Sequence, residues 1–259
     1  MREAESEALS KVLMILEYEG TQYHGFQFQP GLATVQGELE SAILKLTGEG
    51  LRVIAASRTD AGVHAQGQVV SFRIRSALPA ETFIKGLNYY LPEDIAVNSA
   101  CRVKSDFDVR RNARSREYRY TILNRRARSP LQRRFAYSVS SPLGVESMKE
   151  ACEALVGEHD FTPFAGPTAS KVINFVRTVH KAEIGKKGDL LTFDMEANSF
   201  LPQQVRRTVG ALIEVGRGKK TVEEFGEMAR SKKRGVAGPT APAHGLCLMK
   251  VNYRDFEET

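Results

Sequence analysis

The sequence predicts an α+β fold of two α/β subdomains, whose mixed, mainly antiparallel sheets form a central cleft. Strand-like apolar runs alternate with helix-like segments along the whole chain, and both halves repeat this order. Two runs around the turn residues 185–188 also pair plausibly as an antiparallel hairpin. We expect a disordered polar tail at residues 1–10, an N-terminal subdomain at 11–105 with the candidate catalytic residue, and a C-terminal subdomain at 106–259.

The first half is predicted as β-α-β-turn-β-α-β. Thr34 is a candidate N-cap for a helix whose apolar positions, from Val35 to Leu46, follow the helical period. Pro92 ends the second helix. The run 51–56 reads as a buried strand, and 68–75 alternates like a half-buried strand. The expected strands are 11–18, 51–56, 68–75 and 95–103, and the second helix is 80–90.

The second half repeats strands and helices. Pro202 is a favoured first helical residue, so a helix is expected from there to about Val215. On that helix Arg206 borders the apolar stripe, whereas Arg207 is placed on a wetter face. The other expected helices are 145–156 and 221–230, and the expected strands are 118–123, 176–184, 190–197 and 245–253.

Composition limits the class of protein. The chain is 42% hydrophobic and 26% charged, as in a globular domain, and no stretch approaches the ~20 apolar residues of a membrane span. Its polar N-terminus is unlike a secretory signal. Three cysteines and five histidines stand without metal-ligand spacing, so we expect no metal and a location in the reducing cytoplasm.

Positive charge is concentrated in one segment. The net charge is +6, and ten arginines stand between Asp108 and Arg134, opposed there only by Asp108 and Glu117. Such an excess is typical of a protein that binds a polyanion, although a solvated basic face is the alternative. Arginine interleaved with Tyr118 and Tyr120 favours nucleic acid, because guanidinium groups bind phosphate and aromatic rings stack on bases.

The segment 57–65, Ser-Arg-Thr-Asp-Ala-Gly-Val-His-Ala, places an arginine and an aspartate in a short turn. A guanidinium beside a carboxylate lowers its pKa, by roughly 1 to 3 units, and so keeps a nucleophile ionised. The bland alternative is a structural turn, because Asp caps its own backbone and Gly accepts positive φ. His64 is expected to order the loop rather than to transfer protons.

Five blocks in order, from about Val12 to Tyr253, resemble the TruA family of tRNA pseudouridine synthases. In the segment 57–65, Ser57 replaces the usual Gly. Asp108 and Val109 replace the usual His and Ala, and the common His-His pair falls at Pro202–Gln203 or at the neighbouring Gln204. The remaining blocks are Tyr18–Gln27, Phe107–Tyr120, Asn198–Gly210 and Ala241–Leu248.

The resemblance implies the pseudouridine synthase fold, a homodimer, and isomerisation of uridines 38, 39 and 40 of the tRNA anticodon arm. The reaction breaks the N1–C1′ bond, rotates the base and rejoins it through C5, so no cofactor is expected. It requires a carboxylate as nucleophile or base, which we assign to Asp60. Whether Asp60 attacks C1′, adds to C6 or removes a C2′ proton stays open.

Other side chains receive roles around this carboxylate. Arg58 is expected to enter the space left by the flipped base, or else to contact phosphate. Arg206 aligns with a family arginine and is the expected partner of Asp60, with an ordinary snorkelling arginine as the alternative. Tyr118 is expected to stack on the uracil and Leu246 to form an apolar wall, although both could be plain core residues. The expected RNA-backbone contacts are Arg110, Arg114 and Arg116.

Two rival functions stay open at this point, and a third lacks the residues that it needs. One is a pseudouridine synthase for another RNA or another position. Another is a non-catalytic RNA-binding protein, for which the arginines suffice and Asp60 is idle. A metal-dependent nuclease would need clustered Asp, Glu or His ligands, and the sequence presents none.

Overall fold

The computed structural model describes residues 9–167, 169 and 172–254. The chain divides into two compact units, with described residues 9–114 and 251–254 in unit 1, and the rest, from Ser115 to Lys250, in unit 2. The polar tail expected at residues 1–10 therefore lies outside the described residues, apart from Leu9 and Ser10.

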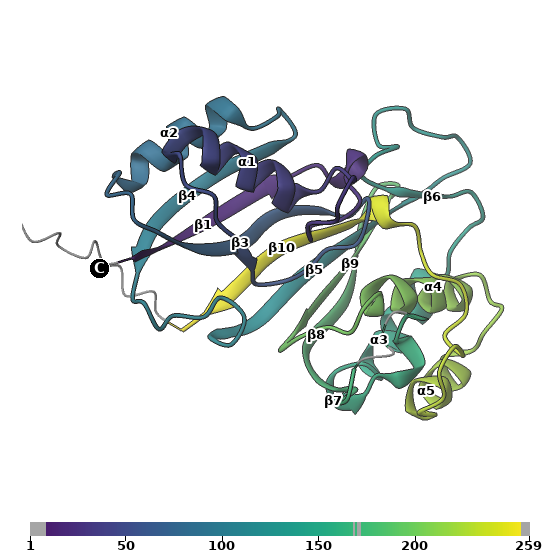
Figure 1. Cartoon of the computed structure of the whole chain (residues 1–259). Coiled ribbons are helices and arrows are strands. Elements are labelled where there is room, and N and C mark those ends of the chain that lie inside the picture. The colour runs from purple at the N-terminus through teal and green to yellow at the C-terminus, as the bar shows by residue number, and fades with distance from the viewer. Residues whose placement is uncertain (1–8, 168, 170–171, 255–259) are drawn as a thin grey trace, which may run out of the picture. The chain divides into compact units, whose positions relative to one another are not determined.

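Unit 1 is a sheet covered by two helices. Its strands β4 (Ile95–Val103), β1 (Ser10–Tyr18) and β3 (His64–Ile74) are antiparallel neighbours in that order, and the short β2 (Ile54–Ala55) pairs with β3. The helices α1 (Val35–Thr47) and α2 (Ala80–Tyr90) lie beside each other over one face of these strands, as Figure 1 shows. The 3-10 turn η1 (Gly20–Gln22) follows β1. This unit has the predicted β-α-β-turn-β-α-β order.

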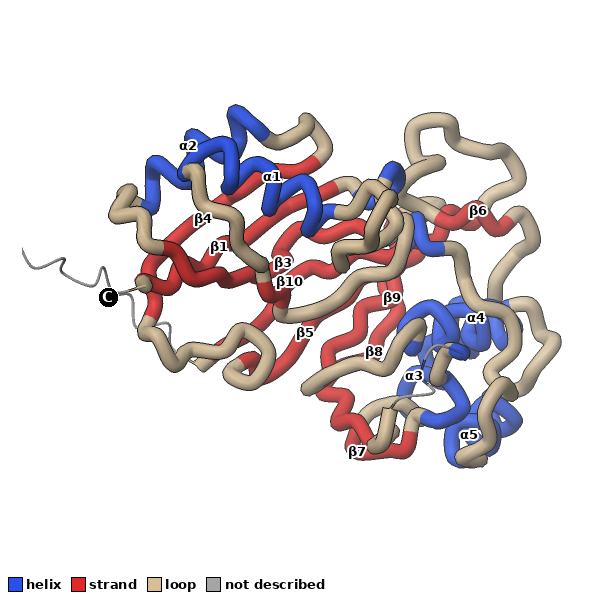
Figure 2. Tube along the Cα trace, viewed as in Figure 1, coloured by secondary structure: helices blue, strands red, loops and turns tan. Residues whose placement is uncertain are grey.

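Unit 2 combines a second set of strands with three helices. The strands β5 (Ala113–Asn124), β9 (Leu190–Ala197), β8 (Val176–Lys187) and β7 (Gly157–Asp160) are antiparallel neighbours, whereas β6 (Tyr137–Val139) pairs in parallel with β5. The helices gather in one group (Figure 2). They are α3 (Val145–Glu153), α4 (Gln204–Gly216) and α5 (Val222–Arg230). Unit 2 also contains η2 (Thr162–Phe164), η4 (Ala243–Gly245) and the first part of β10 (Leu246–Tyr253), which enters unit 1 at Val251.

The predicted fold class, α+β with mixed and mainly antiparallel strands, is confirmed. Local signals placed several helix ends correctly. Thr34 caps α1, because its side-chain oxygen accepts from the Gly37 amide at 3.2 Å. Thr221 and Glu224 form a reciprocal capping box at the start of α5, so Thr221 is the cap and not the first helical residue.

Two strand predictions before β4 were wrong in extent. Residues 51–56 do not form a buried strand, because only Ile54–Ala55 pair with β3 and Ile54 is 47% exposed. β3 begins at His64 and not at Gln68, and it is buried on both sides over Val69–Phe72 instead of half-buried. Ala65 already pairs with Tyr18 of β1, so the end of the segment 57–65 belongs to the sheet.

The start and the faces of α4 also differ from the prediction. Pro202 is not the first helical residue, because Gln203 adopts the left-handed conformation (φ 60°) and the helix begins at Gln204. Arg207 does not lie on a wet face: it is 9% exposed, and its neighbour on that face, Ala211, is fully buried. Elsewhere, α3 ends at Glu153, three residues before the predicted end at Val156, and β6 and β7 were not predicted.

Candidate active site

The candidate catalytic aspartate lies in a tight turn between β2 and β3. The Val63 amide donates to the Asp60 carbonyl at 3.1 Å, and Gly62 supplies the positive φ of 77° that the turn needs. Asp60 is half-buried, whereas Arg58 and Ala61 are exposed. The turn therefore presents the segment that carries Asp60 at the surface of unit 1.

The backbone of this turn packs directly on the loop that follows β1. The Phe26 amide donates to the Thr59 carbonyl at 3.1 Å, and the Gly62 amide donates to the Tyr23 carbonyl at 3.3 Å. Gly20 approaches even more closely, because a Cβ built on it would lie 2.0 Å from the Val63 carbonyl oxygen. Glycine is thus required at position 20 by proximity, as in other close backbone contacts.

Three buried polar side chains fix the same segment through hydrogen bonds. The Gln68 Nε2 donates to the Ser57 carbonyl at 2.7 Å, and the Tyr18 hydroxyl lies 2.7 Å from Thr59 Oγ1. His64 Nδ1 accepts from the Gly20 amide at 3.0 Å, so the neutral ring carries its proton on Nε2. This contact supports the expectation that His64 orders the loop.

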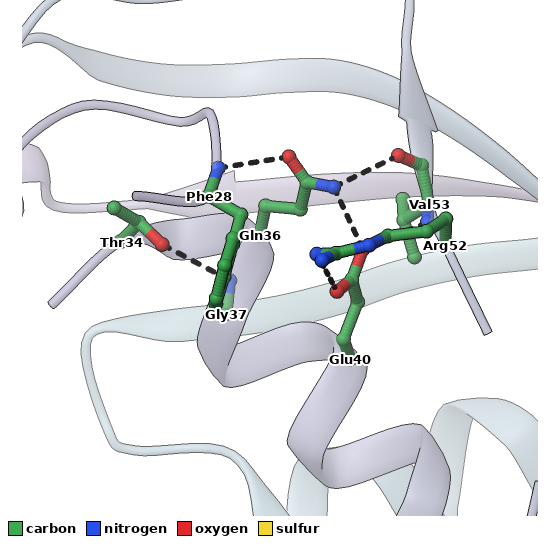
Figure 3. A network of polar contacts seen from close by, with 7 residues as sticks. All are labelled: Phe28, Thr34, Gln36, Gly37, Glu40, Arg52 and Val53. Carbon is green, nitrogen blue, oxygen red and sulfur yellow. Dashed lines mark hydrogen bonds and ion pairs between the residues drawn. The ribbon is translucent and has the colours of Figure 1, made fainter. Parts of the chain in front are cut away.

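Helix α1 binds the backbone of two segments that precede the turn segment in the chain, at Phe28 and at Val53, as Figure 3 shows. The Gln36 side chain accepts from the Phe28 amide at 2.9 Å and donates to the Val53 carbonyl at 3.2 Å. Glu40 accepts from the Val53 amide at 2.9 Å and pairs with Arg52 at 2.8 Å. Both backbone groups of Val53 are therefore used by side chains of α1, which explains why residues 51–53 do not continue a strand.

Positive charge gathers beside the turn in unit 1. Arg110 is exposed, and its Nε donates to the Ala55 carbonyl at 3.0 Å. Burial lowers the pKa of Arg110, and the like charge of Arg58 lowers it further, so these two guanidinium groups interact. Asp108 accepts from the amides of Arg110 and Arg111, which hold the pKa of its carboxyl below the ordinary value. Like charges kept close together are suited to a phosphate ligand.

In unit 2, Arg206 is fixed by the segment that precedes β10. Its Nε donates to the Ala241 carbonyl at 2.8 Å, while its own carbonyl accepts from the Ala241 amide at 3.1 Å. Gly210, one turn further along α4, permits this approach, because a Cβ there would lie 1.8 Å from the Pro239 carbonyl oxygen. These contacts hold the segment 239–241 against the side of α4 that carries Arg206 and Gly210.

Tyr118 and Leu246 are both buried in unit 2, at 6% exposure each. Tyr118 packs edge to face on Phe200, with ring centroids 5.1 Å apart. Two residues along β5, the Tyr120 hydroxyl donates to the Pro242 carbonyl at 2.8 Å. Burial raises the pKa of Tyr120, and the charge of Arg206 opposes that rise. The segment 241–246 thus contacts both β5 and α4, the two elements that carry Tyr118 and Arg206.

The predicted site residues fall on both units. Unit 1 holds Asp60, Arg58, Arg110 and the exposed Arg114, and unit 2 holds the other predicted residues. Arg116 is only 8% exposed, and its Nη1 donates to the Asn198 carbonyl at 2.7 Å. A guanidinium packed in this way has fewer donors to offer a phosphate than an exposed one.

Sequence reasoning assigned no role to Gln68 or Tyr18. The available signal was weak, because Gln68 is a polar residue next to a run of strand-forming residues and Tyr18 ends an apolar run. Buried polar side chains normally have hydrogen-bond partners, but the sequence does not say which ones.

Within residues 9–167, 169 and 172–254, no group of three or more His, Cys, Asp or Glu side chains is placed to hold a metal ion. The same residues contain no helix that is both long enough and apolar enough to cross a membrane.

The structure combines an α+β fold with an aspartate in a turn that has arginines near it. These features fit the class of RNA-modifying enzyme that the sequence resembles. A sequence model of the family described as tRNA pseudouridine synthase matches residues 14–111 and 151–254. The chain belongs to this family, and it is therefore an isomerase that converts uridine in tRNA to pseudouridine.

Individual relatives agree over nearly the full length. The chain is 43% identical to tRNA pseudouridine synthase A of Thermoanaerobacter sp. (strain X514) over 245 residues, which covers 95% of this chain and 100% of the relative. It is also 43% identical to the proteins of that name from Myxococcus xanthus and Exiguobacterium sp., each over 249 residues. These alignments cover 95% and 96% of this chain, and 93% and 100% of the two relatives.

Proposed function

We propose that this enzyme isomerises uridines at positions 38, 39 and 40 of the tRNA anticodon stem-loop, with Asp60 as the nucleophile or base. The observation that supports Asp60 is the turn itself. Its backbone is held by Phe26, by Tyr23 and by the close approach of Gly20, while the aspartate stays half-buried near the surface. Such fixed placement is what a group that must meet one atom of a substrate requires.

The remaining roles form part of the same proposal. Arg58, exposed beside Asp60, takes the space that the flipped base leaves in the stem. Tyr118 stacks on the uracil, Leu246 forms an apolar wall, and Arg206 binds the substrate. The interaction between Arg58 and Arg110 supports a phosphate contact there.

RNA-backbone contact is assigned first to Arg110 and Arg114, which are exposed. Arg116 remains the third residue of this assignment, although its Nη1 already donates to the Asn198 carbonyl. A duplex stem is recognised by shape and phosphate contacts, which is compatible with several neighbouring target positions. A homodimer and a cytoplasmic location also remain part of the proposal, and the mass of the protein in solution tests the first.

The experiment uses unmodified tRNA transcript with tritium at C5 of its uridines. Joining C5 to the sugar expels that label into water, so release measures the isomerisation. Asp60→Asn is expected to abolish release while tRNA binding, measured by filter retention, stays close to that of the wild type. The matched control is Asp106→Asn, the same chemical change at an exposed aspartate of unit 1.

Two outcomes would contradict the proposal. Full release by Asp60→Asn would remove Asp60 from the chemistry. Specificity is tested with transcripts that keep a single uridine at position 38, 39 or 40. If these transcripts release no label and only transcripts with uridines elsewhere do, the rival enzyme for another RNA position is favoured.

A further inference from the structure

A buried side-chain pair lies directly beneath the catalytic turn. Gln68, in β3, is 0% exposed, and Tyr18, at the end of β1, is 3% exposed. Neither side chain can reach solvent or RNA. Their polar atoms therefore act on the protein itself, and the partners that they have decide what they do.

Gln68 binds both backbone groups of one residue in the turn segment. Its Nε2 donates to the Ser57 carbonyl at 2.7 Å, and its Oε1 accepts from the Ser57 amide at 3.4 Å. The backbone of Ser57 is thereby fixed to β3 as if to a neighbouring strand, although residue 57 is in no strand. Ser57 lies three residues before Asp60.

The second Nε2 proton of Gln68 points to Tyr18, whose hydroxyl oxygen lies 3.4 Å away. Because that oxygen accepts from Gln68, the tyrosine proton is available for Thr59 Oγ1 at 2.7 Å. Thr59 is only 7% exposed and directly precedes Asp60. The chain from Gln68 through Tyr18 to Thr59 thus reaches the residue next to the proposed nucleophile.

We propose that Gln68 is a positioning residue for Asp60, acting on the turn through Ser57 and, with Tyr18, through Thr59. This inference rests on the proposed function of Asp60. Removal of the Gln68 amide takes away the two bonds that fix the buried backbone of Ser57 and the bond to the Tyr18 hydroxyl. The turn then relaxes, and a displacement of about 1 Å at a reacting group can cost about 100-fold in rate.

The chain offers a matched control in Asn88. Its Nδ2 donates to the Val97 carbonyl at 3.0 Å and its Oδ1 accepts from the Val97 amide at 2.7 Å. This is the same two-bond arrangement, also within unit 1, but it joins α2 to β4 and not to the catalytic turn. Asn88→Leu and Gln68→Leu therefore each remove a pair of side-chain to backbone bonds, the first at an exposed residue and the second at a buried one.

The test measures tritium release at saturating tRNA, tRNA affinity and melting temperature for both variants. Gln68→Leu is expected to lower kcat about 100-fold with unchanged tRNA affinity, whereas Asn88→Leu lowers the melting temperature and keeps kcat. Equal kcat in the two variants, whether retained or lost, would overturn the proposal. If Gln68→Leu does not fold, Tyr18→Phe, which lacks only the hydroxyl, decides: an unchanged kcat overturns the proposal and a reduced one supports it.

Gln68→Glu gives a further readout that a purely structural role would not move. A buried carboxyl resists ionisation, and its protonated form can donate to the Ser57 carbonyl as the amide does. The rate of Gln68→Glu relative to the wild type should therefore rise as the pH falls from about 8 to about 6. A constant ratio would count against the proposal. Loss of activity in Asp60→Asn is independent of all these results, so failure of the proposed nucleophile is recognised separately.

Discussion

Gly20→Ala places a methyl group against the turn that carries Asp60. The added Cβ would lie 2.0 Å from the Val63 oxygen, 2.6 Å from its carbonyl carbon and 3.0 Å from its nitrogen. Ordinary contact begins at 3.4 Å, so the closest pair is about 1.4 Å too near. All three obstacles are backbone atoms and cannot rotate away, so Gly20 or the turn from Asp60 to Val63 must move by about this distance.

A shift of this size at the turn is expected to lower kcat by about 100-fold. Overpacking should also destabilise the protein by about 1–3 kcal/mol. The tritium-release assay at saturating tRNA gives the first quantity, and urea unfolding gives the second. Binding of tRNA should change little, because the exposed arginines are untouched.

Gly48→Ala is the matched control for this substitution. Gly48 ends α1 with φ 75°, and a Cβ there would meet nothing within 4 Å. The variant should lose roughly 1 kcal/mol through backbone strain at positive φ, with the wild-type kcat. Gly20→Ala with the wild-type kcat would refute the reasoning, because it would mean that the turn absorbs the displacement without moving Asp60.

Two further predictions concern the surroundings of the turn. Glu40→Ala should lower the free energy of unfolding in urea by about 1–3 kcal/mol, because the Val53 amide loses its acceptor. Arg52→Ala should lower it by less than about 1 kcal/mol, because the Arg52 side chain is 65% exposed in its pair with Glu40. Equal losses in the two variants would contradict this assignment. The backbone amides of Arg111 and Arg110 lower the pKa of the Asp108 carboxyl. The stability that the ionised carboxylate contributes is therefore fully present above the ordinary aspartate pKa of 3.8, and it is lost as the pH falls through the lowered pKa. The difference in melting temperature between Asp108→Ala and the wild type should thus be largest near neutral pH and narrow in acid, and a pH-independent difference would count against it.

Membership of the pseudouridine synthase family and the structure explain different parts of the sequence blocks. Membership of the family supports the catalytic role that we propose for Asp60. The structure explains the glycines around it: Gly25, at φ 95°, lies against the Thr59 carbonyl, and Gly62 completes the turn. In unit 2, Gly245 lies against the ring of Tyr120, where a Cβ would be 2.6 Å from Cζ. Gly25 therefore lies where two backbone segments are in contact, and Gly245 lies where the backbone contacts an aromatic ring.

Several elements were predictable because their signals are local. Caps and breakers act on residues within one or two turns, so Thr34 placed the start of α1 and Pro92 the end of α2. The alternation along β5 placed Tyr118 and Tyr120 on one buried face, with Arg119 exposed on the other. The nonapeptide 57–65 likewise identified the candidate nucleophile from neighbours in sequence.

The tertiary structure alone decided how long the strands are and which polar groups are buried. Residues 51–56 have a strand-like sequence, yet Gln36 and Glu40 occupy the backbone of Val53 and stop the strand. Arg207 has a position that periodicity assigns to solvent, but in the structure it is only 9% exposed and Ala211 beside it is fully buried. The bonds from Gln68 to Ser57 and from Tyr18 to Thr59 join residues 11 and 41 positions apart. Periodicity describes one element at a time, whereas these contacts depend on which elements meet. The sequence therefore identified the segment that carries Asp60, but not the contacts that hold it in place.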